Sequence, residues 1–320
     1  MRAIAITKPG GPDVLVEVER PTPEPSRGEV RVRVRATAVN RADLLQRMGA
    51  YPAPFGAPPD VPGLEFAGEV DALGPGVERL AVGDRVFGLV GGGSYTEALV
   101  AYERTLAKIP DGMSFEDAAA VPEAFVTAHD AMITQGELRS GEVVLVHAAG
   151  SGVGTAAIQI GRAIGATVVG TARTADKLDR ARELGMDVGV VVEGARFADR
   201  VPPAAVVIEL VGGAYLAEDV RAAQVQGRIV LVGLLAGAKA ELELGMVLHK
   251  RVRIIGTQLR ARPLEQKIAA MRAFEAQIVP LFTRGALRPV IDRVMPLAEA
   301  AAAHARMASN EGFGKIVLRV

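Results

Sequence analysis

A glycine-rich turn supplies the residues best suited to hold a small charged ligand. Gly150, Ser151, Gly152 and Gly154 follow the apolar run Val143–His147, which is rich in valine and too short for a helix. The apolar residues after the turn recur with a period of 3.6, which predicts a helix ending near residue 165. The unpaired N–H groups at such a helix start lie at the positive end of its dipole, where a pyrophosphate binds well. A tight turn without a ligand is the alternative for this motif taken alone.

The segments around this turn alternate between strand-like and helix-like patterns. A helix is expected at Ala175–Leu184, and other helical segments separate most of the apolar runs. The runs typical of strands are Thr167–Ala172, Met186–Val192, Ala205–Leu210, Arg228–Leu234 and Arg253–Gly256. This alternation predicts an α/β domain with a doubly wound parallel sheet that binds a nucleotide.

Length and charge limit the classes of function. A chain of 320 residues with 49% hydrophobic residues is long enough for two domains, each with its own core. Lys plus Arg and Asp plus Glu balance at 37 each, which argues against a general nucleic-acid or anionic-membrane surface. Small neutral partners fit this composition better.

The absence of cysteine limits the possible chemistry, and the N-terminal segment bears on where the protein is found. With no cysteine, the chain has no disulfide, no thiolate metal site and no cysteine nucleophile. No apolar run approaches the length of a membrane span, and Met1–Pro9 lacks the apolar core of a signal peptide. We therefore expect a cytoplasmic protein.

The two ends of the chain differ from its middle. Glu29–Ala36 alternates apolar and basic residues, as an antiparallel strand with one solvated face does, and frequent turns indicate an irregular β-rich domain. Glu123–Gln135 is expected to be a helix linking the domains, and Pro263–Phe282 a long amphipathic helix. A final strand, helix and strand are expected to return to the first domain. The predicted domains are residues 1–121 with 266–320, and residues 122–265.

Several segments carry a family resemblance that covers the chain from end to end. They are K-P-G-G-P (8–12), V-N-R-A-D-L-L-Q-R (39–47), P-G-L-E-F-A-G (62–68), V-G-D-R-V (82–86), A-A-A-V-P-E-A-F-V-T-A (118–128), H-A-A-G-S-G-V-G-T-A-A-I-Q (147–159), G-T-Q-L-R-A-R (256–262) and G-K-I-V-L (314–318). They resemble the medium-chain dehydrogenase/reductase superfamily, and within it the zinc-free NADPH:quinone oxidoreductases of the zeta-crystallin and PIG-type branch. The resemblance implies a Rossmann NADPH-binding domain and a GroES-like catalytic domain. Ser151 replaces the middle glycine of the usual family turn, as in the PIG-type branch.

The resemblance also bears on metal binding. Zinc-dependent relatives hold a catalytic zinc with two cysteines and a histidine, and the matching positions here are Asn40, Glu123 and Leu64. Leu64 has no donor atom, so we expect no catalytic metal. Alcohol dehydrogenation is then disfavoured, whereas hydride transfer to an electron-poor acceptor remains open. The four histidines, at 129, 147, 249 and 304, show no metal spacing and are expected to be structural.

Reduction of a quinone requires little from the protein beyond positioning and hydrogen bonds to the oxygen that gains charge. The resemblance makes Tyr51 and Asn40 the candidate donors, because both match family positions that line the cleft. The alternative for Tyr51 is an aromatic ring that only packs. Asp43 is expected to orient the Asn40 loop, with proton transfer as the alternative.

The cofactor-binding residues carry over in the same way. The resemblance implies contacts from residues of the glycine turn, from the ends of later strands and from three separate positions. These residues are Asn40, Thr127, Gly150, Ser151, Gly152, Val153, Gly154, Val211, Gly212, Gly233, Leu234, Leu235, Thr257, Leu259 and Lys315. A surface lysine without a ligand is the alternative for Lys315.

The end of the second Rossmann strand predicts a preference for NADPH. NAD-specific sites usually place an acid there, and this strand instead ends T-A-R-T. Arg173 and Lys177 are expected to bind the 2′-phosphate of the cofactor, although solvated charges paired with Asp176 are the alternative.

Three functions are open at this point. The first is an NADPH:quinone oxidoreductase, the second a reductase of α,β-unsaturated carbonyls, and the third a crystallin-like or RNA-binding role without catalysis. The balanced charge and the intact cofactor motif argue against the third. In relatives the sixth Rossmann strand pairs across a twofold axis, so Val252–Gly256 predicts a homodimer.

Overall fold

The computed structural model describes residues 1–320 and divides the chain into two compact units. Unit 1 comprises Met1–Val126 and Leu259–Val320, and unit 2 comprises Thr127–Gln258. The sequence placed these boundaries at 121/122 and 265/266. None of the helices combines the length and apolar character that crossing a membrane requires.

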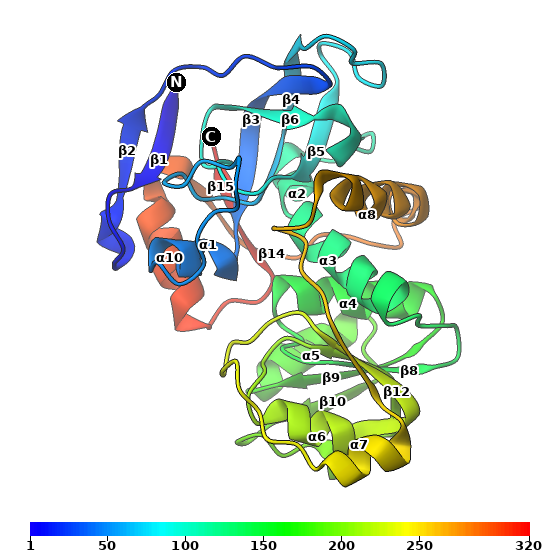
Figure 1. Cartoon of the computed structure of the whole chain (residues 1–320). Helices are drawn as coiled ribbons and strands as arrows, with labels where there is room; N and C mark the ends of the chain where they lie inside the picture. The colour runs from blue at the N-terminus through cyan, green and yellow to red at the C-terminus, as the bar shows by residue number, and fades with distance from the viewer. The chain divides into compact units, whose positions relative to one another are not determined.

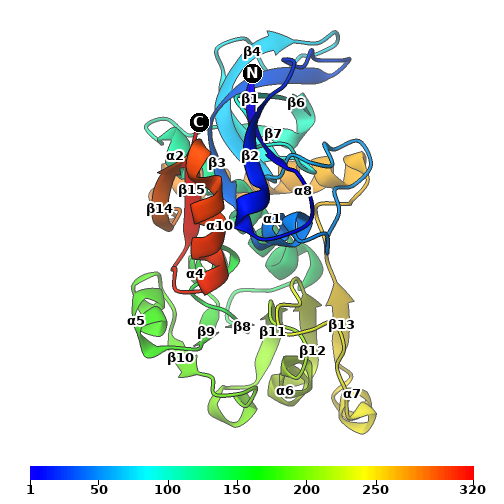
Figure 2. The same cartoon turned by 90° about the vertical axis from the view of Figure 1, so that its left-hand side faces the viewer.

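Unit 2 is built on a six-stranded parallel sheet with the strand order β10-β9-β8-β11-β12-β13 (Figure 2). The predicted doubly wound α/β sheet is therefore confirmed. Its order reverses between β8 and β11, the position at which sheets of this kind bind ligands. The strands are β8 (Val143–Val146), β9 (Thr167–Ala172), β10 (Val188–Val191), β11 (Ala204–Glu209), β12 (Ala223–Leu231) and β13 (Arg253–Gly256).

Helices connect these strands and pack on the sheet. Helix α4 contacts β8 and β9, α5 contacts β9 and β10, and α6 contacts β11 and β12 (Figure 1). The core between them is rich in valine and includes Leu145, Val207 and Ile229, all fully buried. The helices of the unit are α3 (Thr127–His129), η4 (Asp130–Gln135), α4 (Gly152–Ala163), α5 (Ala175–Glu183), η5 (Ala198–Arg200), α6 (Tyr215–Ala222) and α7 (Leu244–Lys250).

Unit 1 is β-rich, with a seven-stranded mixed sheet in the order β14-β15-β3-β4-β5-β7 and β6 paired with β3. All neighbours are antiparallel except β14 and β15. A separate two-stranded sheet joins β1 and β2. The strands are β1 (Arg2–Ile6), β2 (Leu15–Glu19), β3 (Glu29–Val39), β4 (Glu65–Leu73), β5 (Arg85–Leu89), β6 (Ala98–Tyr102), β7 (Leu106–Lys108), β14 (Ile291–Pro296) and β15 (Lys315–Arg319).

Two helical predictions differ from the structure. The segment Glu123–Gln135 is helical but not uniformly α, because π-helical turns η3 and η4 flank the short α3. The single helix expected at Pro263–Phe282 is wrong: α8 ends at Gln277 and α9 begins at Val279. Pro280 lacks the N–H that a continuous helix needs, which accounts for the break.

The helices of unit 1 are η1 (Pro12–Val14), α1 (Arg41–Arg47), η2 (Glu103–Thr105), α2 (Phe115–Ala119), η3 (Pro122–Val126), α8 (Leu264–Gln277), α9 (Val279–Thr283), η6 (Leu297–Glu299) and α10 (Ala300–Ser309).

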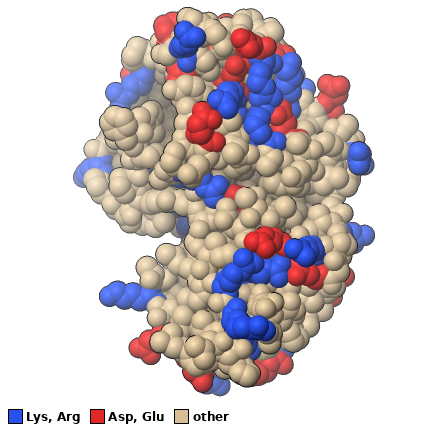
Figure 3. Space-filling view, turned by 45° about the vertical axis from the view of Figure 1, so that its right-hand side comes forward, with Lys and Arg blue, Asp and Glu red and all other residues tan.

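Charged side chains of both signs are interspersed on the face that Figure 3 shows. Several charged side chains of unit 1 are paired across neighbouring strands, as are Arg31 with Asp71 and Arg35 with Glu69. Arg31 and Arg35 thus lie in ion pairs on the solvated face of the sheet, consistent with the prediction from the alternating pattern.

Candidate functional site

The glycine turn of unit 2 connects β8 to α4 and has a geometry that requires glycine. A Cβ on Gly154 would lie 2.4 Å from the carbonyl oxygen of Ala148. Ser151 is the N-cap of α4, and its hydroxyl accepts a hydrogen bond of 3.0 Å from the Gly154 N–H. The turn therefore leads directly into a twelve-residue helix, whose first backbone N–H groups are suited to bind a pyrophosphate.

The other predicted cofactor residues of unit 2 gather at the same edge of the sheet. Most of them directly follow the carboxyl ends of parallel strands, which meet at one edge. Val211 and Gly212 follow β11, Gly233, Leu234 and Leu235 follow β12, and Thr257 follows β13. Leu234 and Leu235 are each about half exposed, at 52% and 53%. Thr127 lies separately, at the start of α3, and Thr257 donates to Asp130 at 2.7 Å.

The two predicted phosphate-binding cations lie at the end of β9. Arg173 is exposed directly after the strand, and Lys177 is half-buried in the first turn of α5. The pKa of Asp176 is lowered by a hydrogen bond from Thr174 and, to a smaller extent, by Lys177. The acid thus interacts with Lys177, while Arg173 is the more exposed of the two cations.

A buried ion pair organises unit 1. The Lys315 ammonium lies 2.6 Å from Glu65 Oε1, and both side chains are almost fully buried. It also donates to Asn40 Oδ1 at 2.5 Å, and Asn40 Nδ2 donates to Glu65 Oε1 at 2.8 Å. Lys315 is therefore engaged with protein groups in this structure. Glu65 was not among the predicted site residues, although an acid inside the apolar segment P-G-L-E-F-A-G was a signal for it.

Asp43 lies beside this ion pair and is fully buried. Its carboxylate accepts from the backbone N–H of Asn40 at 2.8 Å and from that of Gly63 at 3.0 Å. The first bond completes a capping box at the start of α1. Burial raises the pKa of Asp43 to about 6, and the two backbone hydrogen bonds oppose this shift. The contacts of Asp43 are those of a group that holds the Asn40 loop.

The three positions that match zinc ligands in relatives do not form a zinc site. Leu64 is buried and has no donor atom, and the amide of Asn40 is bonded to Glu65 and Lys315. Only the carboxylate of Glu123 remains, which is too few ligands for zinc.

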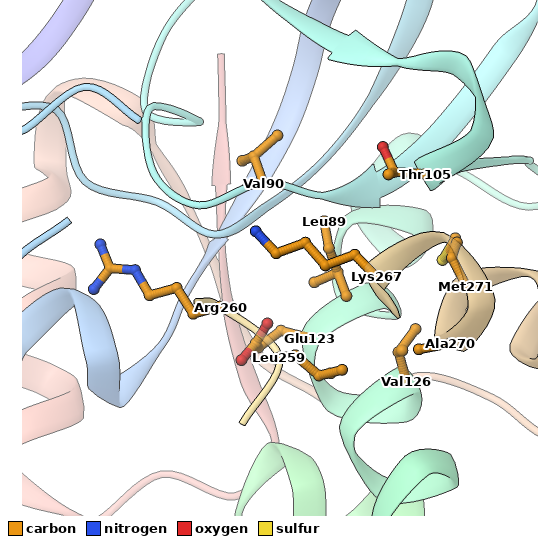
Figure 4. A pocket seen from close by; sticks show the side chains of 10 residues that line it. All are labelled: Leu89, Val90, Thr105, Glu123, Val126, Leu259, Arg260, Lys267, Ala270 and Met271. Carbon is orange, nitrogen blue, oxygen red and sulfur yellow. The ribbon is translucent and has the colours of Figure 1, made fainter. Parts of the chain in front are cut away.

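Glu123 instead lines a small pocket within unit 1, with a cavity volume of about 20 Å³. Figure 4 shows Lys267 extending across the pocket above the Glu123 carboxylate. The other lining residues are Leu89, Val90, Thr105, Val126, Leu259, Arg260, Ala270 and Met271, most of which are apolar. The lining thus combines apolar walls with a few polar groups, as in small-molecule sites, and the closed pocket has room for about one water molecule.

The electrostatics of this pocket favour a neutral acid. Burial, and next the charge of Glu65, raise the pKa of Glu123 to about 8, while Lys315 and Arg260 act in the opposite direction. Burial and the nearby Arg260 lower the pKa of Lys267. At neutral pH the pocket therefore holds a carboxylic acid able to donate a proton. The sequence predicted neither Glu123 nor Lys267 for such a role.

Tyr51 lies at the edge of the same region and is held by Arg260. The guanidinium carbon lies 4.9 Å from the centre of the Tyr51 ring, and Arg260 donates to the Tyr51 carbonyl at 3.1 Å. Arg260 also donates to the Gly91 carbonyl at 2.8 Å and bonds the Gln46 side chain. These contacts join the Tyr51 loop to α1, which follows Asn40.

Two protein families match the chain. The alcohol dehydrogenase GroES-like domain matches residues 26–111, and the zinc-binding dehydrogenase family matches residues 152–275. The quinone oxidoreductase of Pseudomonas aeruginosa is 35% identical over 97% of this chain and 96% of its own length. The polyketide synthase GfsB of Streptomyces halstedii is 36% identical over 99% of this chain, which spans only 6% of that protein.

Solved structures give the same result. A structure titled NAD-dependent alcohol dehydrogenase is 35% identical, with a TM-score of 0.87 and complete coverage of both chains. The Escherichia coli quinone oxidoreductase complexed with NADPH is 27% identical, also with a TM-score of 0.87 and complete coverage of both chains. With its Rossmann-like sheet, GroES-like domain and missing zinc ligands, the chain belongs to the medium-chain dehydrogenase/reductase superfamily, as a zinc-free enzyme of the quinone oxidoreductase type.

Proposed function

We propose that this oxidoreductase transfers a hydride from NADPH to a quinone without the help of a catalytic metal. The observation that carries the proposal is the unit 1 pocket. There Glu123, at a position that matches a zinc ligand in relatives, provides a neutral acid in place of a metal ligand. The names of the Pseudomonas aeruginosa and Escherichia coli relatives support quinone as the acceptor.

The residues of unit 2 fit the proposed cofactor. The start of α4 offers its first backbone N–H groups to the pyrophosphate, because Gly154 keeps the turn close to the helix. Arg173 and Lys177 offer positive charge to a 2′-phosphate. When bound, the nicotinamide supplies the hydride.

The residues of unit 1 serve the acceptor in this proposal. Reduction of a quinone to a hydroquinone adds one hydride and one proton, and Glu123 donates the proton to the oxygen that gains charge. The Lys267 ammonium stabilises that charge before the proton arrives. The apolar walls exclude water, and Tyr51 donates a further hydrogen bond. Asn40 donates to Glu65, whose other carboxylate oxygen accepts from the Glu123 backbone N–H at 2.7 Å, so Asn40 acts on Glu123 through Glu65.

The assay that tests this function follows NADPH oxidation against 1,2- and 1,4-quinones and a panel of enals and enones. We expect quinones to be reduced with the higher kcat/KM. Activity with primary alcohols and NADP⁺, and none with any quinone, would contradict the proposal.

A reductase of α,β-unsaturated carbonyls is the second candidate. It is favoured by the match to GfsB, which shows that this sequence type also occurs within polyketide synthases. The same acid, Glu123, would then protonate the α-carbon after hydride addition at the β-carbon. A higher kcat/KM for enones than for every quinone in the panel would select this candidate.

We also propose that the chain forms a homodimer through β13. This strand is the edge of the parallel sheet, and Arg253, Ile254 and Gly256 are exposed on it. An exposed edge with free backbone groups favours pairing with a second copy. Light scattering at micromolar concentration is expected to give twice the chain mass of 33.5 kDa, and a monomer would refute the proposal.

A further inference from the structure

Unit 2 contains a buried group of one histidine and two acids, which we call the His–Asp–Glu cluster. His147 directly follows β8, Glu209 is the last residue of β11, and Asp219 lies in α6. All three side chains are completely buried. His147 Nε2 lies 2.7 Å from Asp219 Oδ1 and 3.8 Å from Glu209 Oε2.

Two carboxylate oxygens of this cluster have no hydrogen-bond partner when both acids are ionised, because a hydrogen bond between the Glu209 and Asp219 side chains requires a retained proton. They are Glu209 Oε2 and Asp219 Oδ2, both inaccessible to solvent. The other oxygen of Glu209 accepts from the backbone N–H groups of Val211 and Gly212. Buried acceptors without partners are rare, because each loses its hydration without compensation. No lysine or arginine forms an ion pair with either acid.

We propose that the His–Asp–Glu cluster binds one divalent cation, with zinc as the best match. The three ligand atoms lie within 4.8 Å of one another. Tetrahedral zinc with bonds of about 2.0–2.2 Å holds its ligand atoms about 3.3–3.6 Å apart. The separations of 2.7 and 3.8 Å from His147 Nε2 to the two acids lie on either side of this range. Glu209 Oε2 is one of the three ligand atoms, and the other unpartnered oxygen, Asp219 Oδ2, is available for a fourth position.

The surroundings of His147 suit a metal ligand. Its Nδ1 lies 2.8 Å from the Thr171 hydroxyl, a contact that fixes the ring and leaves Nε2 to face the acids. The rings of Phe197 and Tyr215 pack against the imidazole, with centroids 4.7 and 5.1 Å away. Calcium and magnesium require six or more oxygen ligands, usually including water, which this dry cluster does not offer. Imidazole nitrogen and carboxylate oxygen are both zinc ligands, and zinc accepts four of them in a tetrahedral arrangement.

A shared proton is the competing explanation for the two acids. Burial raises the pKa of Asp219 to about 7 and that of Glu209 to about 8, so the metal-free cluster retains a proton at neutral pH. A divalent cation would replace that proton and neutralise both carboxylates. The proposed site is separate from the zinc positions of relatives, which correspond to Asn40, Leu64 and Glu123 in unit 1.

The first experiment measures zinc binding by the whole chain. Metal-stripped protein is incubated with a small molar excess of ZnCl₂ at neutral pH and slightly raised temperature, because a fully buried site fills only through local opening. We expect one zinc per chain by native mass spectrometry and a rise in Tm of about 5 °C or more. X-ray absorption should show only nitrogen and oxygen ligands. MgCl₂ at the same concentration is expected to leave the Tm unchanged.

Two variants separate the cluster from other zinc-binding positions. Asp219→Asn keeps the shape and hydrogen-bonding capacity of the side chain but removes a charged ligand, so it should lose the zinc-dependent rise in Tm. His249→Gln removes an exposed histidine on α7 and should retain it. If wild type takes up no zinc, or if Asp219→Asn binds zinc as tightly as wild type, the proposal is wrong. In the first case the shared proton alone accounts for the cluster.

Discussion

The two units bury acidic side chains in opposite ways. In unit 1, Glu65 is paired with Lys315 at 2.6 Å, and the charge of each side chain is compensated within the protein. In unit 2, Glu209 and Asp219 contact His147 but no lysine or arginine, and each has an oxygen that no N–H or O–H group reaches. A paired buried acid serves to fix the structure around it, whereas an unpaired one must retain a proton or bind a cation. Unit 1 also has one partly buried acid without an ion pair, Glu123, and in our proposal its retained proton is used in chemistry.

The largest expected effect comes from breaking the compensated pair. Lys315→Met keeps the length of the side chain but leaves Glu65 buried without its cation. We expect a loss of about 3–5 kcal/mol in the free energy of unfolding, measured by urea denaturation. Arg319→Gln is the matched control, because Arg319 lies on the same strand as Lys315 and forms an exposed ion pair with Glu116. Its loss should cost less than about 1 kcal/mol. Equal losses in the two variants would contradict the role of the buried pair.

The next effect concerns the unpaired acid of unit 1. Glu123→Gln removes the proposed proton donor and should lower kcat for quinone reduction by about 10²- to 10⁴-fold, with the KM for NADPH unchanged. In wild type, kcat should fall as pH rises through about 8, because the acid form of Glu123 is lost. This decline should be absent from the variant. Glu265→Gln, an exposed acid on α8, should behave like wild type; an unchanged kcat in Glu123→Gln would refute the donor role.

The pKa of Glu123 also affects stability. Because its folded-state pKa of about 8 exceeds the ordinary value of 4.5, the folded chain binds more protons than the unfolded chain between these values. Its contribution to stability is therefore complete below about pH 4.5 and is lost as pH rises through about 8. Unfolding measured across this range should show a shallower decline for Glu123→Gln than for wild type. Parallel curves would mean that Glu123 is ionised in the folded protein at neutral pH.

A smaller effect is expected at the cofactor end of unit 2. Arg173→Ala should raise the KM for NADPH about 5- to 100-fold, because one partly desolvated phosphate contact is lost, with little change for NADH. Lys177→Ala should act in the same direction, and Arg180→Ala, further along α5, should leave both constants unchanged. Steady-state kinetics with both cofactors decides the point. Parallel losses for NADH and NADPH would show that these residues do not bind the 2′-phosphate.

The smallest effect is expected at Tyr51. Tyr51→Phe keeps the ring that packs against Arg260 and removes one hydroxyl, so kcat/KM for quinones should fall by about tenfold or less. The affinity for NADPH and the Tm should not change. Full activity with every acceptor would assign Tyr51 to packing alone.

Local patterns predicted much of unit 2, while long-range contacts decided the site in unit 1. The bounds of β9 and β13 agree with the sequence prediction, because short runs of β-branched residues between turns predict strands, whether buried as in β9 or exposed as in β13. The Glu65–Lys315 pair joins residues 250 positions apart in the sequence, so no local pattern could reveal that both are buried together. The pocket beside Glu123 was missed for the same reason, since Lys267 and Val90 reach it from distant segments. Pro280 marks the break before α9, because proline lacks the N–H of a continuous helix, but the amphipathic pattern runs through it and predicted a single helix.

The most direct test of metal-free quinone reduction is the turnover of chelator-treated protein, with metal content determined on the same sample. We predict that kcat for quinone reduction by NADPH at neutral pH is unchanged when the zinc content falls to zero, even if the Tm falls with it. Loss of turnover on zinc removal, followed by recovery on zinc addition, would contradict the proposed mechanism.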